Sequence, residues 1–358
     1  MGNRNKYRTS RYIRRHAPKV QRTAGVDHAG YKKPETVFID RGEESKFIWW
    51  IANNPYMLMR HKAIIKEVGG TIVSNTGDYS PKGLMMCASN FRFPKRESIK
   101  AVYIAHGTSN KGIGAAWGPE GRAKYDYYFV SGPKQAWCYK KYGHNINGER
   151  NVRYGNPVAD GYLNNTFFVI RQGKEILGIR DDKPILLFAP TFGTGTFNRV
   201  AMLLQKYTDK YHVVITTHPR EVLYEGAKSQ LAWAKIFQGD IHDILWSADA
   251  LIGDVGSTTY DFAITGKPIL LIKPIAENMF YDHPKWMLDY NTPVCIPETE
   301  DIHAKFEEAC ERAEKKNRNG RNDLQEVYRR SFYRPFEGNG TEFAARWIQE
   351  TVKKLWLR

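Results

Sequence analysis

Apolar runs of strand length alternate with longer segments of helical period along most of the chain. After residue 33, β-rich runs at 36–40, 47–52, 71–74 and 101–105 predict strands, and residues 56–68 predict a helix. A further strand at 127–130 is followed by a helix at 133–142, for which Pro133 is a suitable first residue and Gly143 a suitable end. This alternation predicts an α/β domain.

A second series of the same kind begins at Asp181-Asp182-Lys183-Pro184. It contains predicted strands at 185–189, 213–216, 250–253 and 269–272 and a helix at 199–208. The strands at 185–189 (ILLFA) and 269–272 (ILLI) are apolar at every position, which is expected when helices cover both faces of a parallel sheet. The second half therefore predicts another α/β domain.

The chain divides into four predicted segments. They are a basic, disordered arm at 1–33, a Rossmann-like domain at 34–180, a second Rossmann-like domain at 181–338, and a last helix at 339–358. The last helix carries one apolar stripe that includes Phe343, Trp347 and Val352, so we expect it to cross back and pack against the first domain.

The net charge of +16 is concentrated at the two ends of the chain. Residues 1–33 hold ten Lys and Arg against Asp27 alone, a net +9, and residues 312–358 hold twelve against six acids, a net +6. A near-neutral body with basic ends predicts an anionic partner, and a membrane surface, nucleic acid and a polyanionic acceptor all fit. A solvated tail that only aids solubility is the alternative for the arm.

Nothing in the sequence predicts a membrane span or an exported protein. No run of 18 apolar residues exists, and the first residues contain no apolar signal-peptide core. The four cysteines lie far apart without metal-ligand spacing, which indicates reduced thiols rather than disulfides or a zinc site. We expect a cytoplasmic protein that can attach peripherally to the inner face of a membrane.

The first segment with candidate chemistry follows the strand at 101–105. His106 comes directly after this strand, and the loop behind it contains Gly107 and Lys111. Glycines let the backbone approach a ligand closely, and open α/β sheets bind ligands at the carboxyl ends of their strands. A histidine there can accept a proton from a hydroxyl near neutral pH, although a structural role is equally common.

The second segment follows the strand at 213–216. His218, Pro219 and Arg220 come at its end, where a histidine and an arginine suit a phosphate. The alternative is an ordinary surface turn.

The third segment follows the strand at 250–253. Asp254 ends this strand, Gly256 supplies a turn, and Ser257 or Thr258 can cap a helix that also contains Asp261. Backbone N–H groups and hydroxyls at such a helix start favour a pyrophosphate, while a plain helix cap is the alternative.

Together these segments resemble the CDP-glycerol:poly(glycerophosphate) glycerophosphotransferase family of teichoic-acid polymerases and primases. The resemblance covers about residues 100–350 and is carried by short motifs, namely the His106-Gly107 loop with Lys111, Ala189-Pro-Thr-Phe192, His218-Pro219, and Asp254-x-x-Ser257-x-x-x-Asp261 followed by Gly266-Lys-Pro268. The family often has an aromatic residue and two serines after the aspartate, where this chain has Val255-Gly256-Ser257.

The resemblance implies a GT-B-like fold with acceptor chemistry in the first domain and donor binding mainly in the second. On it, His106 matches the family's base, and His218 is expected to serve both catalysis and donor binding. The other expected donor-binding residues are Gly107, Lys111, Thr191, Arg220, Asp254, Gly256, Ser257, Thr258 and Asp261. No metal ion and no other cofactor is expected.

The leading hypothesis is an enzyme that moves glycerol phosphate from a nucleotide-diphosphate donor, CDP-glycerol, to a hydroxyl of a teichoic-acid-like polymer or related anionic acceptor. CMP is then released. A GT-B glycosyltransferase with a nucleotide-sugar donor, and nucleic acid as one acceptor, is the second hypothesis. The third is a non-catalytic polyanion-binding protein, which the presence of His106, His218 and Ser257 disfavours.

Overall fold

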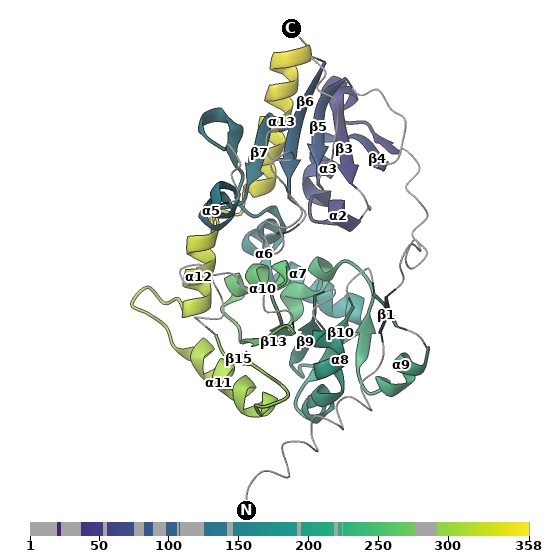
Figure 1. Ribbon diagram of the computed structural model, residues 1–358, viewed down its shortest axis with the longest axis vertical. Coiled ribbons are helices and arrows are strands. Elements are labelled where there is room, and N and C mark those ends of the chain that lie inside the picture. The colour runs from purple at the N-terminus through teal and green to yellow at the C-terminus, as the bar shows by residue number, and fades with distance from the viewer. Residues whose placement is uncertain are drawn as a thin grey trace, which may run out of the picture. The chain divides into compact units, whose positions relative to one another are not determined.

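The computed structural model describes residues 20–22, 37–52, 56–74, 82–88, 98–105, 107, 125–141, 146–191, 195–217, 221–223, 225–275 and 292–357. They form two compact units (Figure 1). The seven-stranded unit runs from β2 to Asn164 and resumes at Arg329, and the six-stranded unit holds Asn165–Tyr328 and β1. Each name counts the described strands of the unit's main sheet.

The seven-stranded unit has the strand order β2-β4-β3-β5-β6-β7-β8, with β2 antiparallel to β4 and the other described pairs parallel. Its strands are β2 (Val37–Ile39), β3 (Ile48–Ala52), β4 (Gly70–Ser74), β5 (Gly83–Cys87), β6 (Ile99–Ile104), β7 (Tyr127–Val130) and β8 (Asn151–Arg153). Its helices are η1 (Glu43–Phe47), α2 (Tyr56–Met59), α3 (Lys62–Val68), α5 (Pro133–Lys141), η3 (Gly148–Arg150), η4 (Pro157–Ala159), α6 (Asp160–Asn164) and α13 (Gly340–Trp356).

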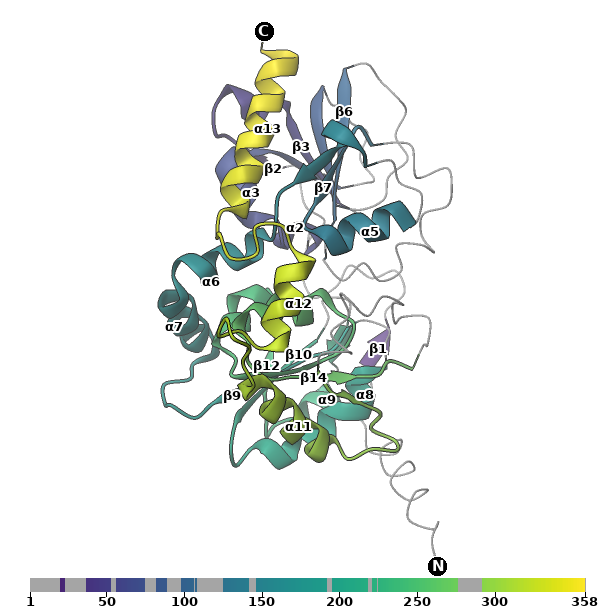
Figure 2. The ribbon, with the colours of Figure 1, turned by 90° about the vertical axis from the view of Figure 1, so that its left-hand side faces the viewer.

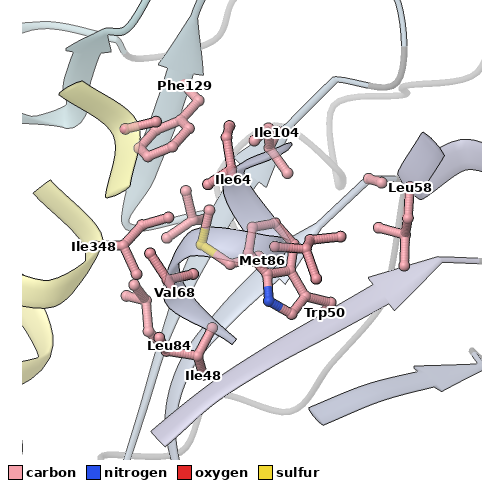
Figure 3. Close-up of a cluster of buried hydrophobic side chains, with 14 of the residues drawn as sticks. Ile48, Trp50, Leu58, Ile64, Val68, Leu84, Met86, Ile104, Phe129 and Ile348 are labelled. Atoms are coloured by element: carbon pink, nitrogen blue, oxygen red, sulfur yellow. The ribbon is translucent and has the colours of Figure 1, made fainter. Parts of the chain in front are cut away.

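Side chains of this sheet alternate between two cores, as the pleat of a strand requires. On one face, Trp50, Met86 and Phe129 pack with α3 and with Ile348 of α13 (Figure 3). The other face packs against α5, and Figure 2 shows α13 and α5 on opposite sides of the sheet. The expectation that the last helix packs on the first domain is therefore confirmed.

The six-stranded unit has the order β12-β10-β9-β13-β14-β15, with all described pairs parallel. Its strands are β9 (Ile185–Ala189), β10 (His212–Thr216), β12 (Lys235–Phe237), β13 (Ala250–Gly253), β14 (Ile269–Ile272) and β15 (Val294–Cys295). Its helices are α7 (Thr166–Leu177), α8 (Thr196–Val200), η5 (Ala201–Tyr207), α9 (Glu225–Gln230), η6 (Ile241–Asp243), η7 (Leu245–Ser247), α10 (Ser257–Phe262), η8 (Ala263–Thr265), α11 (Ile302–Glu314) and the larger part of α12 (Asp323–Ser331).

One face of this sheet forms a core with α8, η5 and α11. Strands β9, β13 and β14 are buried along their whole length, as their uninterrupted apolar sequences predict. The predicted class, two Rossmann-like α/β domains, is confirmed.

The predicted arm contributes one strand to the described structure. β1 (Val20–Arg22) pairs antiparallel with β11 (Glu221–Leu223), whereas the sequence predicted disorder throughout 1–33. A short edge strand offers free backbone groups that can pair with any extended segment, and composition does not reveal this pairing. The rest of the arm lies outside the described residues.

The units also divide at other positions than the sequence pattern suggested. Contacts separate them at Asn164/Asn165 and Tyr328/Arg329, not at 180/181 and 338/339. The reason is α7, which packs on η7 so closely that a Cβ added at Gly173 would lie 2.8 Å from the Ser247 hydroxyl oxygen. Because α7 packs against η7, it is part of the six-stranded unit, and the sequence pattern does not reveal this contact since η7 lies far along the chain.

The four cysteines, all within the described residues, are free. Burial raises the pKa of Cys295 to about 12 and that of Cys310 to about 11, so both thiols stay protonated at neutral pH. Among the described helices, none combines the length and the apolar character needed to cross a bilayer.

Ile348→Ala is expected to destabilise the protein by about 2–5 kcal/mol, because it leaves a cavity where α13 meets the sheet. Glu350→Ala, an exposed position on the same helix, is the control and is expected to change stability by less than about 0.5 kcal/mol. Urea unfolding measures both variants. Equal midpoints for the two would contradict this role of α13.

Candidate functional site

The order in which the strands of the six-stranded sheet are added reverses at β9. This strand comes first in the sequence of the sheet, β10 lies on one side of it and β13 on the other. Open α/β sheets bind ligands outside the carboxyl ends of their strands at such a switch point. Thr191 follows β9 and Asp254 follows β13, so these two residues lie at that edge.

Asp254 joins the ends of these two strands. Its carboxylate accepts hydrogen bonds from the backbone N–H of Thr191 at 3.0 Å, the Thr191 hydroxyl at 2.5 Å and the backbone N–H of Gly256 at 3.3 Å. The side chain is buried, with 1% of the residue exposed. Asp254 was predicted to bind a donor, and the geometry makes it a brace between β9 and α10.

The first turn of α10 follows this brace. Ser257 and Thr258 are half-buried, and no side chain caps the helix start at Gly256. The Thr259 hydroxyl bonds back to the Gly256 carbonyl at 2.6 Å. A Cβ at Gly256 would lie 2.7 Å from the Thr191 hydroxyl oxygen, so a glycine is needed for this close approach.

Asp261 is fully buried one turn further along α10. Its carboxylate lies 3.4 Å from Nε2 of His242, a residue of η6. A carboxylate that is closed to solvent does not touch a ligand at the sheet edge, so Asp261 differs in position from the half-exposed hydroxyls of Ser257 and Thr258.

Four predicted site residues, His106, Lys111, His218 and Arg220, lie outside the described residues. Their chain neighbours Ala105 and Gly107, and Thr217, are described and follow the carboxyl ends of β6 and β10. The predicted residues that the structure brings together are therefore Thr191, Asp254, Gly256, Ser257 and Thr258, all beside the switch point.

Sequence reasoning missed a polar brace at the equivalent edge of the seven-stranded sheet. Nε2 of the buried His61 lies 3.1 Å from the carbonyl oxygen of Ala105, the residue before His106. The neighbouring Arg60, also buried, donates to Oδ1 of Asn156 at 2.6 Å. The sequence shows an arginine and a histidine side by side before a helix, but it does not show that both are buried.

A second unpredicted group lies beyond β14 and β15. Arg199 of α8 donates to both carboxylate oxygens of Glu298, at 2.5 and 2.6 Å, and to the carbonyl of Lys273 at 2.5 Å. The bidentate pair with Glu298 fixes the segment after β15 against α8, and the bond to Lys273 holds the residue that follows β14.

Comparison with solved structures identifies the fold class of this protein. The solved structure of the wall teichoic acid polymerase TagF, H-to-A variant, superposes with a TM-score of 0.64 and 13% identity over 88% of this chain and 91% of that one. A TagF variant soaked with CDPG gives a TM-score of 0.62 and 14% identity over 87% and 89%. At this identity the likeness concerns the fold, a two-domain GT-B-like arrangement of Rossmann-like units.

The family follows from the sequence match. The model of the CDP-Glycerol:Poly(glycerophosphate) glycerophosphotransferase family matches residues 43–339, and the chain belongs to this family. A curated relative is the teichoic acid glycerol-phosphate primase of Bacillus spizizenii, 28% identical over 161 residues. The match spans 41% of this chain and 40% of that primase.

Asp254→Asn is expected to lower stability by about 1–3 kcal/mol. The carboxylate accepts three hydrogen bonds, and in the variant the amide N–H₂ group would face at least one of these donors and could not accept from it. Ser257→Ala, on the same turn but half-buried, is the control and is expected to change stability by less than about 0.5 kcal/mol. Thermal unfolding measures both. An Asp254→Asn protein that melts with the control would contradict the brace.

Proposed function

We propose that this protein transfers glycerol phosphate from CDP-glycerol to a hydroxyl of an anionic acceptor polymer of the teichoic-acid type. The acceptor oxygen attacks the phosphorus that carries glycerol, and the bond from that phosphorus to the bridging oxygen of the pyrophosphate breaks. CMP leaves with the electron pair of this bond, and the hydroxyl proton passes to a base. The products are CMP and an acceptor longer by one glycerol phosphate.

One observation carries the proposal: the brace of Thr191, Asp254 and Gly256 at the switch point of the six-stranded sheet. It holds two strand ends and the start of α10 where an α/β sheet offers a ligand crevice. Family membership supports a glycerophosphate donor, and the CDPG soak of TagF supports the same donor by analogy. Fold alone would not choose a substrate.

The residues take roles that suit phosphoryl transfer, in which positioning and electrostatic stabilisation dominate. His106 is the proposed base, and Lys111, His218 and Arg220 are the proposed cations around the pyrophosphate. Gly107 and Gly256 allow close backbone approach. The proposed hydrogen-bond donors to the phosphates are the hydroxyls of Ser257 and Thr258. Thr191, whose hydroxyl donates to Asp254, lines the proposed phosphate site beside them.

We further propose that the basic arm serves the acceptor's surroundings at the inner face of a membrane. Its net charge of +9 over residues 1–33 exceeds the need of a nucleotide pocket. Polybasic segments bind anionic lipid surfaces and polyanionic polymers through the same Coulombic attraction, which salt weakens.

The direct test is incubation with CDP-glycerol and a glycerol-phosphate acceptor, with UDP-glucose as a parallel donor and chromatography to detect the nucleotide. We expect CMP from CDP-glycerol and no UDP from UDP-glucose. UDP release without CMP would replace the proposal with a glycosyltransferase.

His106→Ala is expected to lower turnover by about two to four orders of magnitude, the usual effect of losing a general base, with CMP affinity unchanged. His303→Ala is the matched control, because its side chain on α11 is 50% exposed. Steady-state rates and calorimetry of CMP binding measure the two effects. Turnover equal to that of the control would remove His106 from the mechanism.

Deletion of residues 2–18 removes six basic residues and spares β1. We expect unchanged CMP affinity and weaker binding to vesicles rich in anionic lipid, with wild-type binding that falls steeply as salt rises. Duplex DNA is the comparison bait in the same sedimentation assay. Full vesicle binding by the truncated protein at physiological salt would show that the arm is a passive tail.

A further inference from the structure

A partly buried histidine of the six-stranded unit lies between two buried carboxylates. Nδ1 of His242 is 3.0 Å from Oδ1 of Asp240, and Nε2 is 3.4 Å from Oδ2 of Asp261. The side chains are 15%, 7% and 0% exposed, respectively. We call these three residues the carboxylate–histidine clamp.

A ring that carries both protons would satisfy both sides of the clamp. Such a ring donates one N–H to each carboxylate and places a positive charge between two buried negative charges. A neutral ring has a single N–H and satisfies one side only. Carboxylates are costly to bury without cations and hydrogen bonds, so His242 holds Asp240 and Asp261 together.

The clamp joins the turn of η6 to the helix α10. Asp240 caps η6 and accepts from the backbone N–H of His242 at 3.1 Å, so the histidine is held at its own turn. Asp261 lies on α10, four residues after Ser257, and positions i and i+4 share one face of a helix. The contact from His242 therefore lies one turn behind the proposed phosphate-binding hydroxyl.

Two other contacts hold the ends of the same segment. The Asp254 brace fixes its start, and Gln325 and Asn322 bond to the carbonyls of Ile264 and Gly266 after its end. The clamp adds an ionic contact from His242 to Asp261, on the Ser257 face of α10.

We propose that His242 is a positioning residue for the donor: acting through Asp261, it sets the rotation of α10 and with it the place of the Ser257 hydroxyl against the donor phosphate. The inference rests on the proposed function, since it assumes a phosphate donor at this edge. It also explains why the second aspartate of the Asp254-x-x-Ser257-x-x-x-Asp261 motif is closed to solvent.

His242→Gln tests the proposal, because glutamine is neutral and can donate to one carboxylate at most. We expect the KM for CDP-glycerol and the Kd for CMP to rise by between about tenfold and a hundredfold, with kcat within about threefold of wild type. Asp261→Asn keeps the shape of the side chain and removes its charge, so it supplies a milder second variant if the first does not fold. The double variant should cost less than the product of the two single effects, because both act through one contact.

His212→Gln is the matched control. His212 also pairs with a carboxylate in the same unit, 2.6 Å from Oδ1 of Asp181, but it begins β10 at the opposite edge of the sheet. Its KM and kcat should match wild type. Hydrogen exchange of residues 257–265 should speed up in His242→Gln and stay unchanged in His212→Gln.

The possible results separate the two proposals. If wild type releases no CMP from CDP-glycerol, the proposed function fails and the positioning role fails with it. If wild type is active and the KM of both clamp variants stays within twofold of the control, only the positioning role fails. Faster exchange in α10 with an unchanged KM would likewise overturn it, because the clamp would then be merely structural.

Discussion

The structure of the candidate site depends on one buried carboxylate that accepts three hydrogen bonds. Asp254 takes two of them from Thr191, beyond β9, and one from Gly256, at the start of α10. A carboxylate that is 1% exposed is costly to bury unless such donors satisfy it, so the two loops are held at a fixed spacing. This spacing leaves the half-buried Ser257 and Thr258 at the edge of the sheet where we propose that the donor phosphates bind.

Similar polar contacts between distant residues lie elsewhere in the six-stranded unit and at the carboxyl edge of the seven-stranded sheet. The His242 clamp holds the middle of α10, Arg199 holds the segment after β15 through Glu298, and His61 contacts the carbonyl before His106. In each case a polar side chain that is buried or partly buried contacts a group from another part of the chain, at a strand end or on α10. Such supports hold a site in one geometry before a ligand arrives, which lowers the cost of binding.

The sequence predicted strongly patterned elements with accurate bounds. The strands Tyr127–Val130, Ile185–Ala189, Ala250–Gly253 and Ile269–Ile272 have the predicted limits, and the helix Gly340–Trp356 lies within the predicted segment 339–358. β5, with the sequence GLMMC, was missed because it contains none of the β-branched and aromatic residues that mark strands. α7 was missed although Asn165 caps it and Gly178 ends it. The predicted single helix at 56–68 is two helices, separated by the turn that holds Arg60 and His61.

By itself, the sequence determined the α/β class, the two-domain organisation, the family resemblance and the residue types at strand ends, because periodicity, composition and short motifs are local properties. Only the tertiary structure decided which of these residues face solvent and which support others. Asp254 and Asp261 belong to one motif and were both expected to bind the donor, yet both are buried, one bonded to Thr191 and the other beside His242. Burial and hydrogen bonding depend on residues 63 and 19 positions away, and folding alone brings these together.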